Sequence, residues 1–252
     1  MGKNWPAIVG QVLLETPAKC VRHDCSFSAA LAQNPRDQLM LLFVFSVIGW
    51  FAGLVVFMSM VEHQVHCNLM HKVPRLRFLR NSAARKRIFT SHAVEHHGQY
   101  RQDFHDEPLP PGEDRGIRLN LWEGLLEGLP LSLLFGLVGY LTGYQTFFIG
   151  AVIWPCVVAL HHTIWNQIHL EMHQPKQRFF ANWEAYKFVA RHHFLHHKYP
   201  DKNFNVAFPV GDFLCGTIAK PSEADWEAMR AEGIAPGVAP EVSPRKADRR
   251  AA

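Results

Sequence analysis

Charge is absent from two long stretches of this chain. No Asp, Glu, Lys or Arg occurs in residues 38–61, and none occurs in residues 128–170. A helix that crosses a membrane needs about 20 apolar residues, so the first stretch predicts one transmembrane helix and the longer second stretch predicts two. A buried hairpin in the core of a large soluble protein is the alternative, but uncharged runs of this length exceed the usual length of soluble helices.

The second stretch contains residues that typically separate or bend helices. Thr142 and Gly143 predict a turn near its middle. Pro130 is expected near the start of the first helix, and Pro155 is expected to kink the second. The chain should therefore contain three membrane-crossing helices, or four if residues 5–15 or a re-entrant turn add another crossing.

Patterns of cysteine and of basic residues that would indicate other protein classes are also missing. The net charge of +4 is mild, and Lys and Arg do not form a stripe with interleaved aromatic residues, so no nucleic-acid partner is expected. No serine or cysteine nucleophile motif and no flavin fingerprint is present. The cysteines are too scattered for a zinc knuckle or a disulfide framework: Cys20, Cys25, Cys67, Cys156 and Cys215.

The positive charges predict how the spans are oriented. Only four of the 26 Lys and Arg residues precede the first span, and the others lie in residues 62–120 and 171–252. Cytoplasmic segments of membrane proteins carry the excess of Lys and Arg. Both polar segments are therefore expected on the cytoplasmic side, and an odd number of spans would place the N-terminus outside.

Histidine is the residue that is unusually abundant. Of the 16 histidines, all except His23 lie between His63 and His197. They form four motifs next to the predicted spans, HCNLMH, HAVEHH, HLEMH and HFLHH, which can close around a common centre in a helical bundle. Residues three or four apart share one face of a helix, so we expect these partners to converge: His169 with His173, His92 with His96, and His193 with both His196 and His197.

Ten imidazoles exceed the needs of one metal ion, because zinc sites take four ligands, so the motifs predict two metal ions. A metal buffer is the first alternative, but buffers carry loose His tracts rather than distinct spacings. A metal transporter is the second, but its ligands would lie at the middle of the membrane rather than beyond the ends of the spans. Residue type alone does not choose between zinc, copper, iron and nickel.

The motifs H-x4-H, H-x3-HH, H-x3-H and H-x2-HH, in this order and attached to predicted membrane helices, resemble those of the fatty acid hydroxylase and sterol desaturase superfamily of integral-membrane di-iron enzymes. The resemblance covers roughly residues 38–217. Asn205 stands where the family pattern suggests a glycine, and Gly211 where an aromatic residue often occurs. The end of the chain's last motif is similar to the family's ending, in which an Asn-Phe pair and a later Asp precede Gly-Thr: Asn203, Phe204, Asp212, Gly216 and Thr217.

The resemblance implies a set of ligands, a cofactor and a reaction. Two iron ions are expected, with zinc possible after purification, and O2 is the cosubstrate. The reaction would hydroxylate an unactivated C–H bond of a membrane lipid such as a fatty acyl chain, an aminolipid or a sterol. A desaturase with the same metals and a metal-binding membrane protein without turnover are the alternatives. The implied ligands are His66, His71, His92, His96, His97, His169, His173, His193, His196 and His197.

Electrons should come from a separate ferredoxin, rubredoxin or cytochrome b5-like donor with its reductase, because no haem or flavin domain is fused to the chain. Other polar residues are candidates to support the ligands, for example by accepting the second ring N–H of a histidine. His192 is not among them, because it lies about 100° around a helix from His193. The candidates are His63, His162, Asn166, Asp201 and Asp212, together with Glu62, Glu95 and Glu171.

These features predict an all-α protein, an integral membrane helical bundle with a cytoplasmic helical cap that carries the dimetal site. We expect an N-terminal segment at residues 1–37, the hydroxylase-like domain at 38–220 and a C-terminal tail at 221–252. The tail should be largely disordered apart from one short helix around SEADWEAMRAEG. A multi-pass protein of the bacterial inner membrane, with its metal site on the cytoplasmic side, fits this organisation.

Overall fold

The computed structural model describes residues 35–74, 76–100, 104–105 and 118–235. Within these residues every regular element is a helix and there is no strand, which confirms the all-helical prediction. Contacts divide the chain after Val44, and the unit that begins at Phe45 contains all the described histidines. The expected N-terminal segment, apart from its last residues, and the end of the C-terminal tail lie outside the described residues.

Three helices form the apolar part of the molecule. Helix α2 spans Pro35–Val65 and continues into the π-helical turn η1, His66–His71. Helix α6 spans Leu121–Thr142, and helix α7 spans Thr146–His173. Among the described residues these three helices are long and apolar enough to cross a membrane. The prediction of one long apolar helix in the first uncharged stretch and two in the second is confirmed.

The turn between α6 and α7 lies at the predicted position. Gly143 ends α6 with a positive φ of 74°, a conformation that glycine adopts without the steric cost of a β-carbon. The expectation for Pro130 was wrong, because the helix begins well before it. Asn120 caps α6 by accepting hydrogen bonds from the backbone N–H groups of Trp122 and Glu123, so Pro130 lies inside the helix. Pro155 lies inside α7, as expected.

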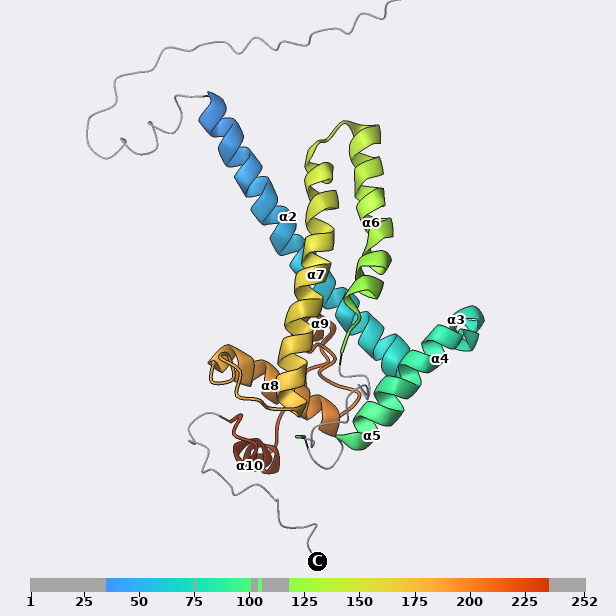
Figure 1. Ribbon diagram of the computed structural model, residues 1–252, viewed down its shortest axis with the longest axis vertical. Helices are drawn as coiled ribbons and strands as arrows, with labels where there is room; N and C mark the ends of the chain where they lie inside the picture. The colour runs from blue at the N-terminus through green and yellow to red at the C-terminus, as the bar shows by residue number, and fades with distance from the viewer. Residues whose placement is uncertain (1–34, 75, 101–103, 106–117, 236–252) are drawn as a thin grey trace, which may run out of the picture. The chain divides into compact units, whose positions relative to one another are not determined.

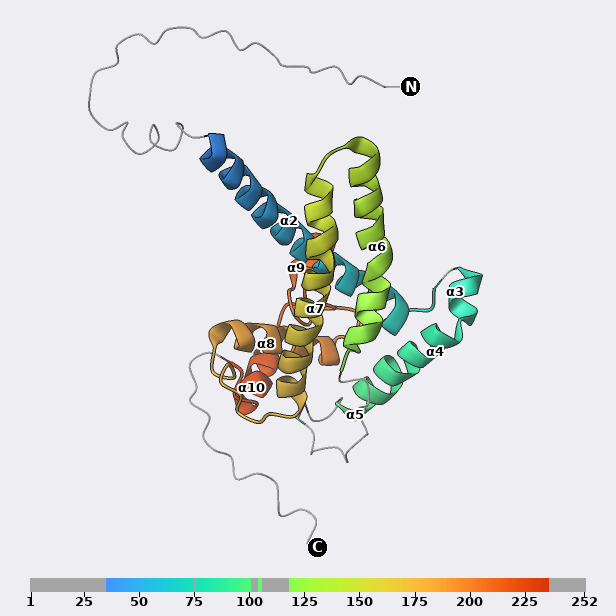
Figure 2. The same cartoon turned by 45° about the horizontal axis from the view of Figure 1, so that its top comes forward.

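The long helices expose apolar side chains and pack closely on each other. Phe45, Leu133 and Leu141 are more than half exposed, which suits a lipid environment better than water. Helices α6 and α7 run side by side in opposite directions (Figures 1 and 2). Trp154 of α7 donates a hydrogen bond of 2.9 Å from Nε1 to the carbonyl of Gly128, whose missing side chain allows this approach. Helices α6 and α7 thus form a closely packed helical hairpin.

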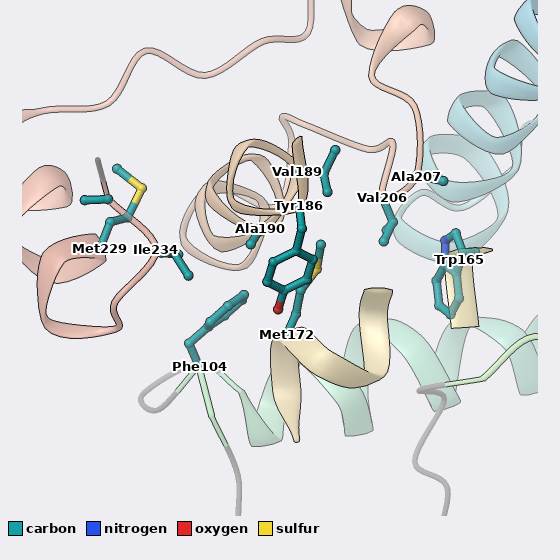
Figure 3. Close-up of a cluster of buried hydrophobic side chains, with 11 residues drawn as sticks. Phe104, Trp165, Met172, Tyr186, Val189, Ala190, Val206, Ala207, Met229 and Ile234 are labelled. Carbon is teal, nitrogen blue, oxygen red and sulfur yellow. The ribbon is translucent and has the colours of Figure 1, made fainter. Parts of the chain in front are cut away.

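A second layer of shorter helices lies at the end of α7 that carries its histidines. Figure 1 shows α8 at this end of α7 and α10 beside α8. Figure 3 shows the core between them, in which Met172 of α7 meets Tyr186 and Ala190 of α8, with Phe104 and Met229 nearby. The helix expected around SEADWEAMRAEG is α10. The shorter elements are α3 Arg77–Asn81, α4 Ala83–Phe89, η2 Thr90–His96, α5 His97–Gln99, α8 Glu184–Lys198, α9 Val210–Cys215 and α10 Glu223–Ala231.

Candidate metal centre

The fold brings the ten histidines of the four motifs together in two groups of five. In each group, one side-chain nitrogen from every histidine lies within 4.8 Å of the others, so each group could hold a metal ion. The first histidine group combines residues from η1, η2, α5 and α8, and the second combines residues from η2, α7 and α8. The first group is His66, His71, His92, His97 and His196, and the second is His96, His169, His173, His193 and His197.

A π-helical turn explains how the H-x4-H motif works. His66 and His71 are the first and last residues of η1, five positions apart. In an α-helix two residues five positions apart point about 140° away from each other around the axis, whereas the wider i to i+5 hydrogen bonding of a π-helix brings both residues to the same face. The two Nε2 atoms lie 3.3 Å apart. The spacing of this motif is therefore matched to the local winding of the backbone.

The second π-helical turn and helix α8 divide neighbouring histidines between the two groups. On η2 and α5, His92 and His97 point into the first group, while His96 points into the second. The expected pairing of His92 with His96 was therefore wrong, because the turn is π-helical rather than α-helical. On α8, His196 faces the first group, opposite to the expectation that it would join His193.

The two other expected pairings hold in the folded chain. His169 and His173 lie in the second group together, as do His193 and His197. These pairs are four positions apart on the α-helices α7 and α8, where that spacing places both side chains on one face. Each HH dipeptide, residues 96–97 and 196–197, supplies one histidine to each group.

The distances between ring nitrogens are short and similar in both groups. Nε2 of His193 lies 3.0 Å from Nε2 of His169, of His173 and of His197. Nitrogen ligands at about 2.1 Å from a metal ion and at right angles to each other would be about 3.0 Å apart, whereas tetrahedral ligands would be about 3.4 Å apart. These three distances are closer to the spacing of ligands at right angles than to that of tetrahedral ligands.

The first group shows the same spacing around His196. Its Nε2 lies 3.1 Å from Nε2 of His71 and 3.1 Å from Nε2 of His97. Nε2 of His66 and of His92 are 2.7 Å apart. His71 and His97 are partly exposed, whereas the other eight histidines of the two groups are buried. The first group is therefore closer to solvent.

Backbone carbonyl groups orient several of the rings. Nδ1 of His196 lies 2.7 Å from the carbonyl oxygen of Lys202, and Nδ1 of His173 lies 2.9 Å from that of Phe104. Nδ1 of His66 contacts the carbonyl oxygen of Phe204. A carbonyl oxygen only accepts, so Nδ1 carries the hydrogen and the Nε2 atom of each neutral ring presents a lone pair to its group. The expected carboxylate acceptors do not fill this role for these three histidines.

The rings outside the long apolar helices are held neutral. Burial lowers the pKa of His92, His96, His193, His196 and His197 well below the usual value, and the neighbouring imidazoles, which would repel a positive charge, lower it further. Burial is also the main cause that lowers the pKa of His97 to about 3. Metal ligation requires neutral imidazole, so these rings are ready to bind a cation at pH 7.

Asp212 organises the loop behind the first group. Its carboxylate accepts hydrogen bonds from the backbone N–H of Phe204 at 2.9 Å and of Asn205 at 2.7 Å, and lies 2.9 Å from Nε2 of His192. Burial raises the pKa of Asp212, but hydrogen bonds from His192 and Thr217 lower it overall. Asp212 therefore acts on His66 indirectly, by holding the residue whose carbonyl contacts Nδ1 of His66.

Glu62 fastens the same loop from the side of α2. Its carboxylate accepts hydrogen bonds from the backbone N–H of Val206 at 2.8 Å and from the side chain of Asn205 at 3.0 Å. Nε2 of His161 lies 3.2 Å from the same carboxylate. Glu62 and Asp212 together replace the water that the loop's backbone groups would otherwise bind.

Asn205 and Gly211, the two positions at which the chain differs from the pattern that its motifs resemble, lie next to each other. Asn205 uses its side-chain oxygen to accept a hydrogen bond of 2.9 Å from the backbone N–H of Asp212. A β-carbon at Gly211 would lie only 2.6 Å from that oxygen, and 2.8 Å from the carbonyl oxygen of Ser59. A side chain at position 211 would therefore collide both with Asn205 and with the backbone of α2, so glycine is the residue that fits there without a shift of its neighbours.

The remaining candidates lie around the site without joining either group. Nε2 of His63 is 3.0 Å from the hydroxyl of Thr217 and 3.6 Å from Asp212. Nδ1 of His162 is 3.0 Å from the carbonyl oxygen of Val158. The Asn166 side chain pairs with both backbone groups of Leu119, at 2.6 and 2.9 Å. Glu171 accepts from Arg178 and from the backbone of Lys176, whereas Glu95 and Asp201 are exposed.

Some contributors could not be found from the sequence. His192 joins neither group, as expected, but it is buried and holds Asp212. The ring of Tyr100 stacks on that of His173, with centroids 3.9 Å apart. The carbonyl groups of Phe104, Lys202 and Phe204 have no signal in residue type, because every residue has a carbonyl. The one signal in the sequence was that His192 directly precedes His193, a ligand candidate.

Comparisons with known proteins add no assignment to this geometry. No protein-family model, no curated protein and no solved structure matches the chain. The functional argument therefore depends on the residues of the site and on their arrangement.

Proposed function

We propose that this protein is a membrane-bound di-iron oxygenase that hydroxylates an unactivated C–H bond of a membrane lipid. The observation that carries the proposal is the convergence of ten imidazoles, from four separate segments, into two adjacent groups of five. The order and spacing of the motifs, which resemble those of the fatty acid hydroxylase and sterol desaturase superfamily, support the same conclusion. The first and second histidine groups would each hold one iron ion.

The nitrogen lone pairs of the site support metal binding. Nδ1 of His66 and of His196 each face a carbonyl oxygen, so both rings present Nε2 lone pairs to the first group. His71 lies within 3.3 Å of both Nε2 atoms and, as a neutral ring, could donate a hydrogen to only one of them. Lone pairs facing each other at this distance repel unless a cation lies among them.

The number of nitrogen atoms favours iron over a structural zinc ion. Zinc sites in proteins are nearly always tetrahedral with four ligands, whereas each histidine group offers five nitrogens. The five histidines of each group would hold one iron ion between them. Iron bound here would supply the redox chemistry that activates O2, which no side chain of the protein can supply.

The chain's own residues prepare the site for this chemistry. Burial and mutual repulsion keep the imidazoles neutral, and the carbonyl groups of Phe104, Lys202 and Phe204 fix three of the rings. Hydroxylation places one oxygen atom in the substrate and releases the other as water, which consumes two electrons and two protons. The electrons would come from a separate ferredoxin, rubredoxin or cytochrome b5-like protein with its reductase.

The position of the site favours a lipid substrate. His66 and His173 stand at the ends of two helices that are long and apolar enough to cross a membrane. An open apolar groove of about 600 Å³ lies between α2 and α6, lined by side chains such as Trp50, Phe57 and Phe135. A lipid chain in the bilayer could occupy this groove while its polar end stays near the membrane surface.

Metal content and product analysis test the proposal. The purified protein should contain two iron ions per chain, and cells that express it should show an O2-dependent gain of one oxygen atom on a lipid. His173→Ala and His196→Ala, one from each group, should each lose about one metal ion and abolish the product. His23→Ala and His105→Ala are the controls and should retain both properties.

Two results would change the assignment. A folded, active protein without metal, or full turnover by both His173→Ala and His196→Ala, would contradict it. Loss of two hydrogen atoms from the lipid instead of gain of oxygen would indicate a desaturase with the same site.

A further inference from the structure

The segment between the first long helix and the second histidine motif is strongly basic. Residues 72–94 contain seven Lys and Arg residues and no Asp or Glu. Four of these cations, Arg77, Arg80, Lys86 and Arg87, are exposed on α3 and α4. Among the described residues no carboxylate forms an ion pair with them. Within the part of the chain that the structure describes, no carboxylate therefore neutralises the charge of these four side chains.

The same segment exposes large apolar side chains. Val73, Leu76 and Phe78 are each more than half exposed, and Phe78 is 71% exposed. Apolar side chains next to unpaired cations are costly in water but typical of helices that lie in the headgroup region of a membrane. We define the basic hairpin as residues 72–89 excluding residue 75, which lies outside the described residues.

The basic hairpin is held at the end of the first long helix. The apolar helix with its π-helical turn ends at His71. Arg85, which is buried, donates a hydrogen bond of 2.8 Å to the carbonyl of Lys72, and its guanidinium lies 4.6 Å from the centre of the Phe89 ring. Figures 1 and 2 show α3 and α4 leading sideways from this end of α2. If α2 crosses the membrane, the hairpin lies at headgroup depth.

We propose that the basic hairpin binds anionic lipid headgroups of the membrane in which the protein resides. Leu76 and Phe78 enter the boundary between headgroups and acyl chains, and the four exposed cations pair with lipid phosphates. This inference depends on the proposed membrane location, but not on the metal content or the reaction. Clusters of Lys and Arg directly beyond a membrane helix bind anionic lipids through this combination of charge and apolar contact.

Lipid binding at the hairpin also has a consequence for the candidate metal centre. Helix α4 continues without a break into η2 and α5, which carry His92, His96 and His97. These three histidines supply ligand nitrogens to both groups. A lipid that holds α4 at the membrane surface therefore also fixes the direction of the helix that joins the two groups.

Native mass spectrometry of the full chain in detergent tests the proposal. The protein is titrated with phosphatidylglycerol and, separately, with phosphatidylcholine, and bound lipids are counted. The parent should retain phosphatidylglycerol preferentially. The double variant Arg77→Gln/Arg80→Gln should bind it about fivefold more weakly for each cation removed. The matched control Lys176→Gln/Lys220→Gln removes two exposed cations elsewhere and should behave like the parent.

A second measurement keeps the test independent of whether the variant folds. The preference of the parent for phosphatidylglycerol should fall when salt is raised from about 0.15 M to about 1 M, because salt screens exposed charges. Equal binding of both lipids by the parent, or an unchanged preference in the double variant, overturns the proposal. If the double variant keeps the lipid preference of the parent but binds a small acidic ferredoxin more weakly, the basic hairpin is a docking site for an electron donor instead. Iron content in the same samples tests the proposed function separately.

Discussion

At the residue scale, the loop behind the first histidine group depends on one position that has no side chain. A β-carbon at Gly211 would lie 2.6 Å from Oδ1 of Asn205 and 2.7 Å from Cβ of His63. The backbone carbonyl oxygen of Ser59 also borders this space, and backbone atoms of a helix cannot move aside freely. Gly211→Ala should therefore lower the free energy of unfolding by about 1–3 kcal/mol, the usual cost of overpacking.

A thermal unfolding scan of the protein in detergent measures the effect of Gly211→Ala. The matched control is Gly136→Ala in α6, where an added β-carbon meets nothing within 4 Å. Because alanine favours helix more than glycine does, the control should be neutral or slightly stabilising. A midpoint for Gly211→Ala equal to that of the parent would show that the loop adjusts at little cost.

At the element scale, the spacing of the H-x4-H motif is matched to a π-helical turn. His66 and His71 face each other because η1 winds more widely than an α-helix. Exchanging Met70 and His71, as Met70→His with His71→Met, keeps the composition but moves the imidazole by one position, about 80–100° around the axis. Metal analysis should show the loss of about one ion per chain, from the first group.

The exchange has a direct counterpart on an α-helix. His173 ends α7 in ordinary α-helical winding, so Met172→His with His173→Met tests the same displacement without a π-helical turn and should empty the second group instead. Retention of both ions by the Met70 and His71 exchange would mean that η1 rewinds, and that the π-helical turn is not required.

The attachment of α10 to the end of α8 has its own pH dependence. Asp225 contacts the ammonium of Lys198, lies 3.1 Å from the hydroxyl of Tyr199 and caps α10 with Ser222. Burial raises the pKa of Asp225, but these hydrogen bonds outweigh it and lower the pKa to about 2. A folded-state pKa below the unfolded value means that this stability is present in full above about pH 4 and is lost as the pH falls toward 2.

Asp225→Asn should consequently lower the free energy of unfolding at pH 7 by about 1 kcal/mol, a modest value because the Lys198 side chain is 44% exposed. The difference between parent and variant should shrink as the pH is lowered from 5 to 3 in thermal scans. Glu223→Gln, which removes an exposed pair with Arg230, serves as the control and should change stability little at any pH. A difference that grows on acidification would contradict the sign of this linkage.

At the scale of the whole molecule, the long uncharged stretches predicted the helical architecture better than the spacing of the histidines predicted the geometry of the site. The uncharged runs gave the three long helices, and the turn at Gly143 followed from residue type. The start of α6 was missed because Asn120 caps the helix inside a charged region. The ten histidines were found from their spacing, but their division into two groups was not.

The reason for that failure is physical. The division of His92 from His96 follows from the π-helical winding of η2, which a local α-helical pattern does not predict. On α8 the winding is α-helical, and His196 joins the first group because it lies about 100° around the helix from His197, which faces the second group. The carbonyl groups that orient His66, His173 and His196 are likewise placed by the chain's path rather than by residue type. Sequence therefore indicated which residues meet, and the fold determined which of them face each other.

The predicted orientation of the molecule in the membrane depends on the sequence alone. Most Lys and Arg residues lie in segments 62–120 and 171–252, so both segments should face the cytoplasm. Single cysteines at Lys86 and Ala239 should react only with reagents that reach the cytoplasmic side, and one at Thr142 only from the opposite side. Lys86 is chosen rather than its neighbour Arg85, because Arg85 is buried and a cysteine there would be poorly accessible to the reagents. Helices α6 and α7 form a hairpin, so a cysteine at position 142 that reacts from the cytoplasm would mean that this hairpin does not cross the membrane, and the histidine groups could then no longer be assigned to its cytoplasmic end.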